Sequence, residues 1–206
     1  MPSNQSDWDA KHRLAAKEPP SEPASIVREL LPLLPPGPAL DIACGTGRHA
    51  LFLVARGQHV TAVDFSSVAL DTLEARARGM RIPVRRSSGV PTAGRHLHGG
   101  LDLIQANLEE TQLPERRFDL IICIQYLQRS LFPQMVRALR PDGVLLTETF
   151  TRAQLEFAGG PRNPAYLLET GELREAFPSL CVLFYRELRA GQGIASLLAQ
   201  KPKKIE

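Results

Sequence analysis

One stretch of sequence decides the fold of this chain: Leu40-Asp41-Ile42-Ala43-Cys44-Gly45-Thr46-Gly47-Arg48-His49-Ala50. Its apolar start predicts a strand, the two glycines one residue apart predict a tight turn, and the residues after Gly47 predict a helix. A second strand is expected at 59–64, and it also ends in an acid, Asp64. Glycines let a ligand approach the backbone closely, and an acid at the next strand end suits a ribose diol. The stretch therefore predicts a site for a nucleotide-type cofactor.

Strands and helices alternate through the rest of the chain. Parallel strands are expected at 39–43, 59–64, 101–106, 118–124 and 144–150, and helices at 48–56, 66–79, 131–140 and 169–177. Two further strands, 181–188 and 194–200, have a short connection and must pair antiparallel. The expected fold is α/β: a single Rossmann-like, doubly wound domain with helices on both faces. Its seven-stranded mixed sheet combines five parallel strands with an antiparallel C-terminal hairpin.

Length and composition favour one globular domain spanning residues 1–206. Residues 1–35 are expected to form an N-terminal arm and helix, and 80–100 an Arg-rich insertion loop without periodicity. No apolar run approaches the roughly 20 residues of a membrane span, and no signal-peptide core is present. The three cysteines are odd in number and far apart, which favours reduced thiols over a disulfide frame or metal site. We therefore expect a cytoplasmic protein, as a monomer or homodimer.

The glycine turn alone leaves two cofactor classes open. Gly45-x-Gly47-x-x-Ala50, with Asp64 19 residues after Gly45, also satisfies the fingerprint of nicotinamide enzymes. Against that interpretation, Asp41 at the mouth of the site would repel a pyrophosphate but would suit an ammonium group. The chain also lacks the mass for a separate catalytic domain, and none of its tyrosines has a lysine four residues on.

Taken in order, the motifs resemble those of class I S-adenosylmethionine-dependent methyltransferases. The run from Leu40 to Ala50 resembles their first motif, and the strand ending in Asp64-Phe65-Ser66 resembles the second. Three later stretches of this sequence resemble further motifs of the family: Gln105-Ala106-Asn107-Leu108-Glu109, Phe118-Asp119-Leu120-Ile121 and Leu139-Arg140-Pro141-Asp142-Gly143. The resemblance covers about residues 36 to 150. Trp8-Asp9 and the helix after Gly47 are similar to the small tellurite-resistance-type, thiopurine-type or type 11/12 members.

The resemblance implies S-adenosyl-L-methionine as cofactor and S-adenosyl-L-homocysteine as its product. Asp41 and Arg48 would hold the methionine part, Asp64 would accept both ribose hydroxyls, and Asn107 stands where the family often has Asp for the adenine amine. The expected cofactor-binding residues are Asp41, Ala43, Cys44, Gly45, Gly47, Arg48, Asp64, Phe65, Asn107, Leu108 and Cys123.

Four residues are weaker candidates for contact with the methyl acceptor: Trp8, Tyr126, Arg162 and Tyr166. Trp8, with His12, either folds over the cofactor as a lid or packs on the sheet edge. Arg162 and Tyr166 belong to the loop 151–168, beyond a strand end, where α/β sheets form their ligand crevice. No metal ligand and no catalytic residue is assigned, because no general base stands out.

These features predict an enzyme that transfers a methyl group to a small-molecule acceptor, a thiol, amine or metalloid-type nucleophile, mainly by positioning. One alternative is an RNA or protein methyltransferase that uses the basic segment 76–98; another is a non-catalytic S-adenosylmethionine-binding protein. Residues 75–100 contain six arginines, His96 and His98, but no acid. They also lack an aromatic residue for base stacking, so a nucleic-acid partner is possible but not favoured.

Overall fold

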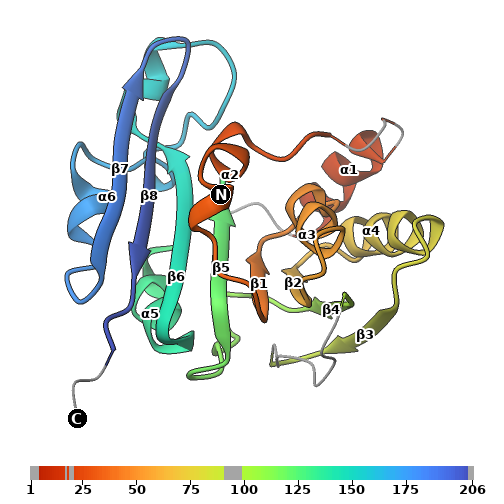
Figure 1. Cartoon of the computed structure of the whole chain (residues 1–206). Coiled ribbons are helices and arrows are strands. Elements are labelled where there is room, and N and C mark those ends of the chain that lie inside the picture. The colour runs from red at the N-terminus through yellow and green to blue at the C-terminus, as the bar shows by residue number, and fades with distance from the viewer. Residues whose placement is uncertain (1–4, 17, 19–20, 91–98, 204–206) are drawn as a thin grey trace.

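The computed structural model describes residues 5–16, 18, 21–90 and 99–203 and contains a single eight-stranded sheet (Figure 1). Its strands are β1 Ala39–Ile42, β2 Val60–Asp64, β3 Val84–Ser88, β4 Leu101–Gln105, β5 Phe118–Ile124, β6 Leu139–Phe150, β7 Cys181–Arg189 and β8 Gly193–Gln200. They lie in the order β3-β4-β2-β1-β5-β6-β8-β7. All neighbours from β3 to β6 are parallel, and β8 is antiparallel to both β6 and β7. The α/β Rossmann-like fold expected from the sequence is thus confirmed.

The helices cover both faces of the sheet. They are α1 Gln5–Ala15, α2 Ser25–Glu29, α3 Arg48–Val54, α4 Ser67–Gly79, α5 Phe132–Ala138 and α6 Glu172–Glu175. Four 3-10 helices are η1 Leu31–Leu33, η2 Arg129–Leu131, η3 Arg152–Glu156 and η4 Pro164–Tyr166. Buried side chains of α2, α3 and α4 form one hydrophobic cluster with one face of the sheet, and those of α5 and α6 form a second cluster with the other face. This is a three-layer arrangement.

The strand order indicates where the sheet can bind a ligand. The chain proceeds from β1 to β2 on one side, and β5 later pairs with the other side of β1. In open α/β sheets, ligands bind beyond the carboxyl ends of the strands at such a switch point. The end of β1, where the glycine turn lies, is therefore the centre of the candidate site.

The sheet has one strand more than the seven expected. Residues 84–88, placed by sequence in an insertion loop over 80–100, form β3 and pair in parallel with β4 at the sheet edge. Four of the five β3 residues are exposed, so the strand shows no hydrophobic alternation that sequence reading could detect. Residues 91–98 of the expected loop, with Arg95, His96 and His98, lie outside the described residues.

Other boundaries also differ from expectation. The helix expected at 131–140 ends at Ala138, because Leu139 already pairs with Phe118 as the start of β6. Residues 141–143, which separate the expected helix from the strand expected at 144–150, lie inside β6, where the register with β5 shifts before Val144. The helix expected at 169–177 is reduced to Glu172–Glu175. In the described part of the chain, no helix has the length and hydropathy needed to cross a bilayer.

Candidate functional site

Asp41 lies at the centre of the candidate site. It is 1% exposed within β1, and its carboxylate accepts a hydrogen bond from the backbone amide of Ala50 at the start of α3. Its Oδ2 atom is buried and has no hydrogen-bond partner among the described residues. Burial raises the pKa of Asp41 to about 7, assisted by the charge of Asp64 and opposed by Ala50 and Arg48. A buried acceptor without a donor is costly, so this atom fits a cationic or donor group of a ligand.

The turn after β1 is held in left-handed backbone conformations. The φ angles of Ala43, Gly45 and Gly47 are 53°, 54° and 85°. The amide of Cys44 donates to the Val63 carbonyl at 3.0 Å, which ties the turn to β2. A Cβ at Gly47 would lie 2.1 Å from Cδ1 of the buried Leu73, so α4 packs directly against this glycine.

Replacing Ala43 by glycine should raise the free energy of unfolding by up to about 1 kcal/mol, because an L-residue is strained at positive φ. Urea unfolding of Ala43→Gly measures this change. Ala55→Gly is the matched control: Ala55 is exposed and has a φ of −60°. That substitution should destabilise by about 0.5–1 kcal/mol. A loss of stability in Ala43→Gly would show that Ala43 is unstrained.

Asp64 ends β2 beside the glycine turn. Its Oδ2 accepts from the Gly45 amide at 2.8 Å, and its Oδ1 accepts from the Ser66 amide at 2.9 Å. A carboxylate has about four acceptor sites, so these two bonds orient it and leave acceptor capacity for a ligand diol. Phe65, the next residue, is half-buried. The geometry therefore supports a ribose-binding role for Asp64.

Arg48 points from the start of α3 toward acids from two different strands. Its Nη2 donates to Oε1 of Gln125 at 2.9 Å. Burial lowers the pKa of Arg48, while the charges of Asp41 and Glu148 raise it. Glu148, at the end of β6, is buried and accepts from the Ser196 hydroxyl at 2.6 Å. Sequence reasoning missed Glu148, because a single acid in an apolar strand gives no sign of its neighbours.

The residues expected at the adenine follow β4. Asn107 is half-buried, and its Oδ1 accepts from the Glu109 amide at 3.0 Å. That bond engages the carbonyl that was expected to accept from an adenine amine. Leu108 is buried, and its carbonyl accepts from Nε2 of Gln128 at 3.0 Å. Both residues lie at the same sheet edge as Asp64, since β4 pairs with β2.

The expected acceptor side lies beyond β5. Cys123 is buried, and burial raises the pKa of its thiol. Tyr126 donates to Oε1 of Gln128 at 2.5 Å. Burial raises the pKa of Tyr126, and so do the charges of Cys123, Glu109, Asp64 and Tyr166, which places Tyr126 within electrostatic range of all four.

Tyr166 and Arg162 both lie in the loop after β6, and Arg162 is bound within that loop. Both terminal nitrogens of Arg162 donate to carbonyls of its own loop, Leu155 and Phe157. Arg129, which sequence reasoning did not single out, holds the loop instead. Its guanidinium pairs with both carboxylate oxygens of Glu172 and donates to the carbonyls of Ala165 and Leu167.

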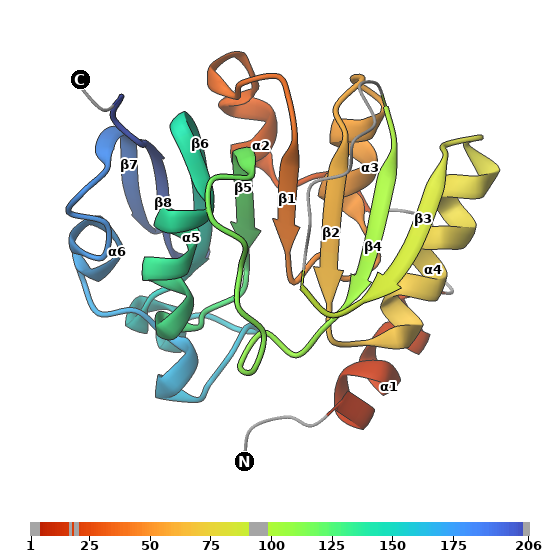
Figure 2. The ribbon, with the colours of Figure 1, turned by 90° about the horizontal axis from the view of Figure 1, so that it is seen from below.

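Helix α1 lies over the same edge, next to the start of α4 (Figure 2). The Ser66 hydroxyl donates to Oδ1 of Asp9 at 2.5 Å. Arg76 of α4 donates to the carbonyl of Glu18, just after α1, and to the carbonyl of Thr46 in the glycine turn. The rings of Trp8 and His12 stack with centroids 5.9 Å apart. Helix α1 and the residue Glu18 after it thus cover the site and are held there at two places, by Ser66 and by Arg76.

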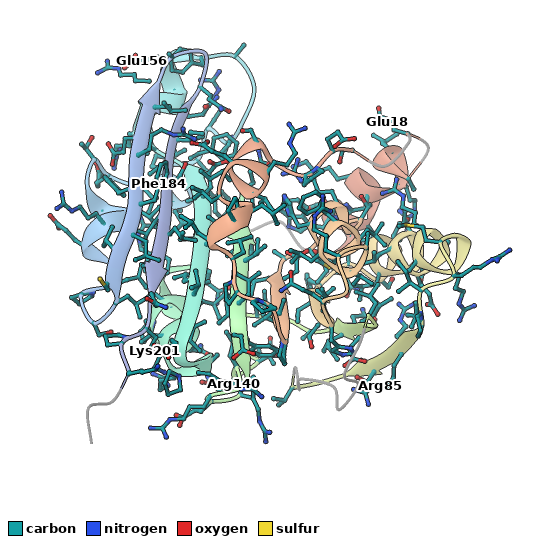
Figure 3. The ribbon with its side chains drawn as sticks, viewed as in Figure 1. Glu18, Arg85, Arg140, Glu156, Phe184 and Lys201 are labelled. Atoms are coloured by element: carbon teal, nitrogen blue, oxygen red, sulfur yellow. The ribbon has the colours of Figure 1, made fainter. Side chains whose placement is uncertain are left out.

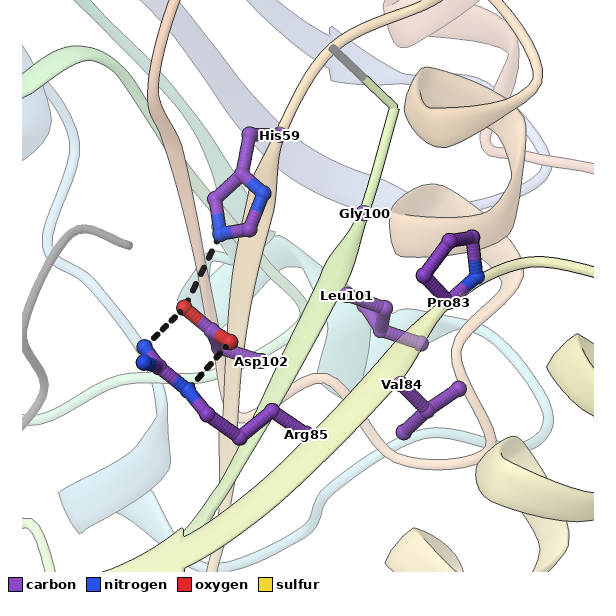
Figure 4. Close-up of a pocket in the computed structure, with 7 residues that line it drawn as sticks. All are labelled: His59, Pro83, Val84, Arg85, Gly100, Leu101 and Asp102. Atoms are coloured by element: carbon purple, nitrogen blue, oxygen red, sulfur yellow. Dashed lines mark hydrogen bonds and ion pairs between the residues drawn. The ribbon is translucent and has the colours of Figure 1, made fainter. Parts of the chain in front are cut away.

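A pocket outside the candidate site lies at the opposite edge of the sheet, where β2 and β4 begin (Figure 4). Figure 3 shows Arg85 at this edge and Glu18 at the other. Within the cavity of about 150 Å³, Asp102 accepts from His59 at 2.9 Å and from Arg85 at 3.0 and 2.8 Å. Burial alone would raise the pKa of Asp102, but the hydrogen bonds and charges of His59 and Arg85 outweigh burial. The pKa of Asp102 is therefore lowered. The cluster attaches β3 to the sheet.

Most described arginines of the basic segment have partners within the chain. Arg78 pairs with Glu74, Arg85 pairs with Asp102, and Arg86 pairs with both Asp71 and Glu74. The acids come from α4 and β4, where a scan of residues 75–100 alone does not find them. These pairings favour a structural role for the segment. In the described residues, no cluster of His, Cys, Asp and Glu is arranged to hold a metal ion.

A doubly wound sheet with a glycine turn, an unpartnered buried acid and a second acid on the next strand defines a protein that binds a nucleoside-type cofactor. Comparison with known families makes the class specific. Residues 39–143, about half of the chain, match the family described as "Methyltransferase domain", and the chain belongs to that family. Membership implies S-adenosyl-L-methionine as the cofactor, and the orphaned Oδ2 of Asp41 fits the ammonium group of its methionine part.

Curated relatives agree with this assignment, and a solved structure shares the fold. The chain is 23% identical over 134 residues to a ubiquinone biosynthesis O-methyltransferase of Rickettsia akari, with 63% of this chain and 46% of that protein covered. It is 28% identical over 185 residues to a trans-aconitate 2-methyltransferase of Methylobacterium nodulans, with coverages of 84% and 64%. The chain thus spans about half to two thirds of these two relatives. TehB from Haemophilus influenzae shares the fold with a TM-score of 0.69 and 18% identity, over 87% of this chain and 62% of that one.

Proposed function

We propose that the protein is an S-adenosylmethionine-dependent methyltransferase acting on a small-molecule acceptor. The observation that carries the proposal is the pair of acids at neighbouring strand ends: Asp41 with an unpartnered buried oxygen, and Asp64 oriented by two backbone amides. These match the two polar parts of the cofactor, its ammonium and its ribose diol. The relatives named for ubiquinone biosynthesis and for trans-aconitate support a small acceptor.

The bound cofactor supplies a methyl group already activated by a sulfonium, so the protein's task is alignment and exclusion of water. Asp41 and Arg48 hold the amino-acid end, and Asp64 fixes the ribose end. By fixing both ends, these three residues would hold the methyl group in one direction, so that a bound acceptor could approach in line. Positioning of this kind can contribute on the order of 7–11 kcal/mol to lowering a barrier.

The acceptor pocket is proposed between Tyr126, Tyr166 and helix α1. Tyr126 and Tyr166 lie within electrostatic range of each other, and Trp8 on α1 is 36% exposed. For the acceptor atom we propose a thiol, amine or metalloid-type nucleophile, because such groups attack an activated methyl without strong activation by the protein.

Two measurements test the proposed function. Calorimetric titration should show binding of S-adenosylhomocysteine with a Kd on the order of micromolar (about 8 kcal/mol) and no tight binding of NADH. A labelled-methyl transfer screen over small thiols, amines, metalloid oxyanions, hydroxy acids and total RNA should then label a small molecule. Tight NADH binding without a response to S-adenosylhomocysteine would contradict the proposal. Labelling of RNA alone would move it to the nucleic-acid alternative.

Affinity for S-adenosylhomocysteine should rise with pH as Asp41 ionises. The pKa of Asp41 is raised to about 7 without ligand. An ammonium ligand favours the ionised form, so binding releases a proton below that pKa. Affinity should fall up to about tenfold per pH unit below 7 and level off above it. Calorimetry across this range measures the slope, and Asp41→Asn should abolish it. A slope that persists in Asp41→Asn would assign the titration to another group.

A further inference from the structure

The imidazole of His12 lies directly over the glycine turn. Its Cε1 atom is 3.3 Å from the position that a Cβ on Gly45 would occupy. The ring stacks on Trp8, and α1 is held down by the bond between Asp9 and Ser66. His12 is therefore placed by a docked helix, so close to Gly45 that a Cβ there would require the ring to shift by a few tenths of an ångström.

That spot corresponds to the middle of the cofactor, an argument that rests on the proposed function. Asp41 is assigned to the ammonium end and Asp64 to the ribose end. Gly45 lies between them, since it follows Asp41 in the turn and donates to Asp64 at 2.8 Å. In S-adenosylmethionine the sulfur joins the amino-acid part to the ribose, so a cofactor held by Asp41 and Asp64 would have its sulfur near Gly45, on the side that His12 faces.

We propose that His12 faces the reacting sulfur and accepts the proton that the acceptor loses during methyl transfer. In that step a lone pair of the acceptor forms a bond to the methyl carbon, and the carbon–sulfur bond breaks with its electron pair left on sulfur. The acceptor's proton passes to an imidazole nitrogen and then to water. The proposal narrows the acceptor to one with a proton on the attacking atom: of the classes proposed above, a thiol or an amine.

The surroundings of His12 suit a proton acceptor. Burial lowers the pKa of His12, as does the charge of Lys11, while the charges of Asp64 and Asp9 raise it. The ring is therefore neutral near pH 7 and free to accept a proton, and the nearby carboxylate of Asp64 stabilises the imidazolium once it forms.

Other ionisable groups at this edge are engaged elsewhere. Glu148 accepts from Ser196 and faces Arg48. The Tyr126 hydroxyl donates a hydrogen bond to Gln128, and Cys123 is 2% exposed. Asp41 is assigned to the ammonium group. Among the described residues, His12 is thus the group that combines exposure, a place over the turn and a suitable protonation state.

The test compares the binding of S-adenosylmethionine with that of S-adenosylhomocysteine, which lacks the methyl group and the positive charge on sulfur. Between about pH 5 and 7, where the α-amino groups of both ligands remain protonated, Asp41 affects both affinities equally and cancels in their ratio. Protonated His12 repels a sulfonium but not a neutral thioether. The affinity of S-adenosylmethionine relative to S-adenosylhomocysteine should therefore fall by about threefold or more at the acid end.

His12→Gln should make this ratio independent of pH while both ligands still bind. In NMR titrations, the pKa of His12 should be lower with S-adenosylmethionine bound than with S-adenosylhomocysteine bound. A ratio that is flat in the wild type, or equal His12 titrations in both complexes, would overturn the proposal. Failure of both ligands to bind would instead overturn the proposed function.

Kinetics then test the proton transfer itself, with the acceptor found in the labelled-methyl screen. kcat of the wild type should fall as pH drops through the His12 pKa measured by NMR in the S-adenosylmethionine complex. His12→Gln should lower kcat by about 10²-fold or more and remove that limb, with S-adenosylhomocysteine affinity at pH 7 nearly unchanged. A His12→Gln variant with the wild-type kcat and pH profile would reject the role, and so would an acceptor without a proton on its attacking atom.

Discussion

Asp64→Asn is expected to weaken S-adenosylhomocysteine binding by about 10²- to 10⁴-fold. Each hydrogen bond from a ribose hydroxyl to a charged carboxylate contributes about 1.5–3 kcal/mol, and Asp64 is positioned to accept two. The substitution also removes an acceptor from the site itself, because an asparagine nitrogen would face the amide of either Gly45 or Ser66. Calorimetric titration at pH 7.5 measures the loss.

Asp71→Asn is the matched control for this experiment. Asp71 is an exposed acid on α4 that pairs with Arg86, away from the glycine turn. Its loss should leave the affinity unchanged. Thermal unfolding of both ligand-free variants separates binding from folding. If folded Asp64→Asn binds within about threefold of the wild type, a difference under 1 kcal/mol, Asp64 does not hold the ribose.

Gly47→Ala is expected to lower the free energy of unfolding by about 2–5 kcal/mol. A left-handed conformation costs an L-residue about 1–2 kcal/mol, and forcing a methyl group into a packed core costs about 1–3 kcal/mol more. The new Cβ would lie 2.1 Å from Cδ1 of Leu73, which is fully buried in α4. Since small domains are stable by about 5–15 kcal/mol, this is a large share. Urea unfolding measures it.

Gly57→Ala isolates the conformational part of that cost. Gly57 has a φ of 86°, nearly that of Gly47, but a Cβ there meets nothing within 4 Å. It should therefore destabilise by only about 1–2 kcal/mol. Equal losses in the two variants would mean that Leu73 and α4 move aside, and that the glycine turn is not held by close packing.

The parts of the fold that sequence predicted are those with strong local patterns. β1, β2, β4, β5 and β8 are apolar runs between turns, and α3 and α4 follow strands directly. β3 escaped because an exposed edge strand shows no alternation. Its pairing depends on β4 and on the contacts of Arg85 with Asp102, which are long-range features.

The candidate site divides in the same way. The glycine turn, Asp41 and Asp64 lie within motifs that a sequence shows directly. Contacts made across the fold were not predictable: Glu148 facing Arg48, Arg129 holding the loop after β6, and the short approach of His12 to Gly45. Each joins residues more than 30 positions apart, and each depends on strand order and helix docking. Arg162 was expected in the site for its place in the loop, yet it binds its own backbone.

The way Arg76 holds the end of α1 bears on how the acceptor preference of such a protein can change in evolution. Both of its contacts, to Glu18 and Thr46, are made to backbone carbonyls. Every residue type offers the same carbonyl, so mutations at these two positions leave the fastening intact. Under the proposed function, the side chains of α1 that would face an acceptor, Trp8 among them, can therefore change while these two hydrogen bonds keep the helix in place. New acceptor preferences can then accumulate on a surface whose placement does not depend on them.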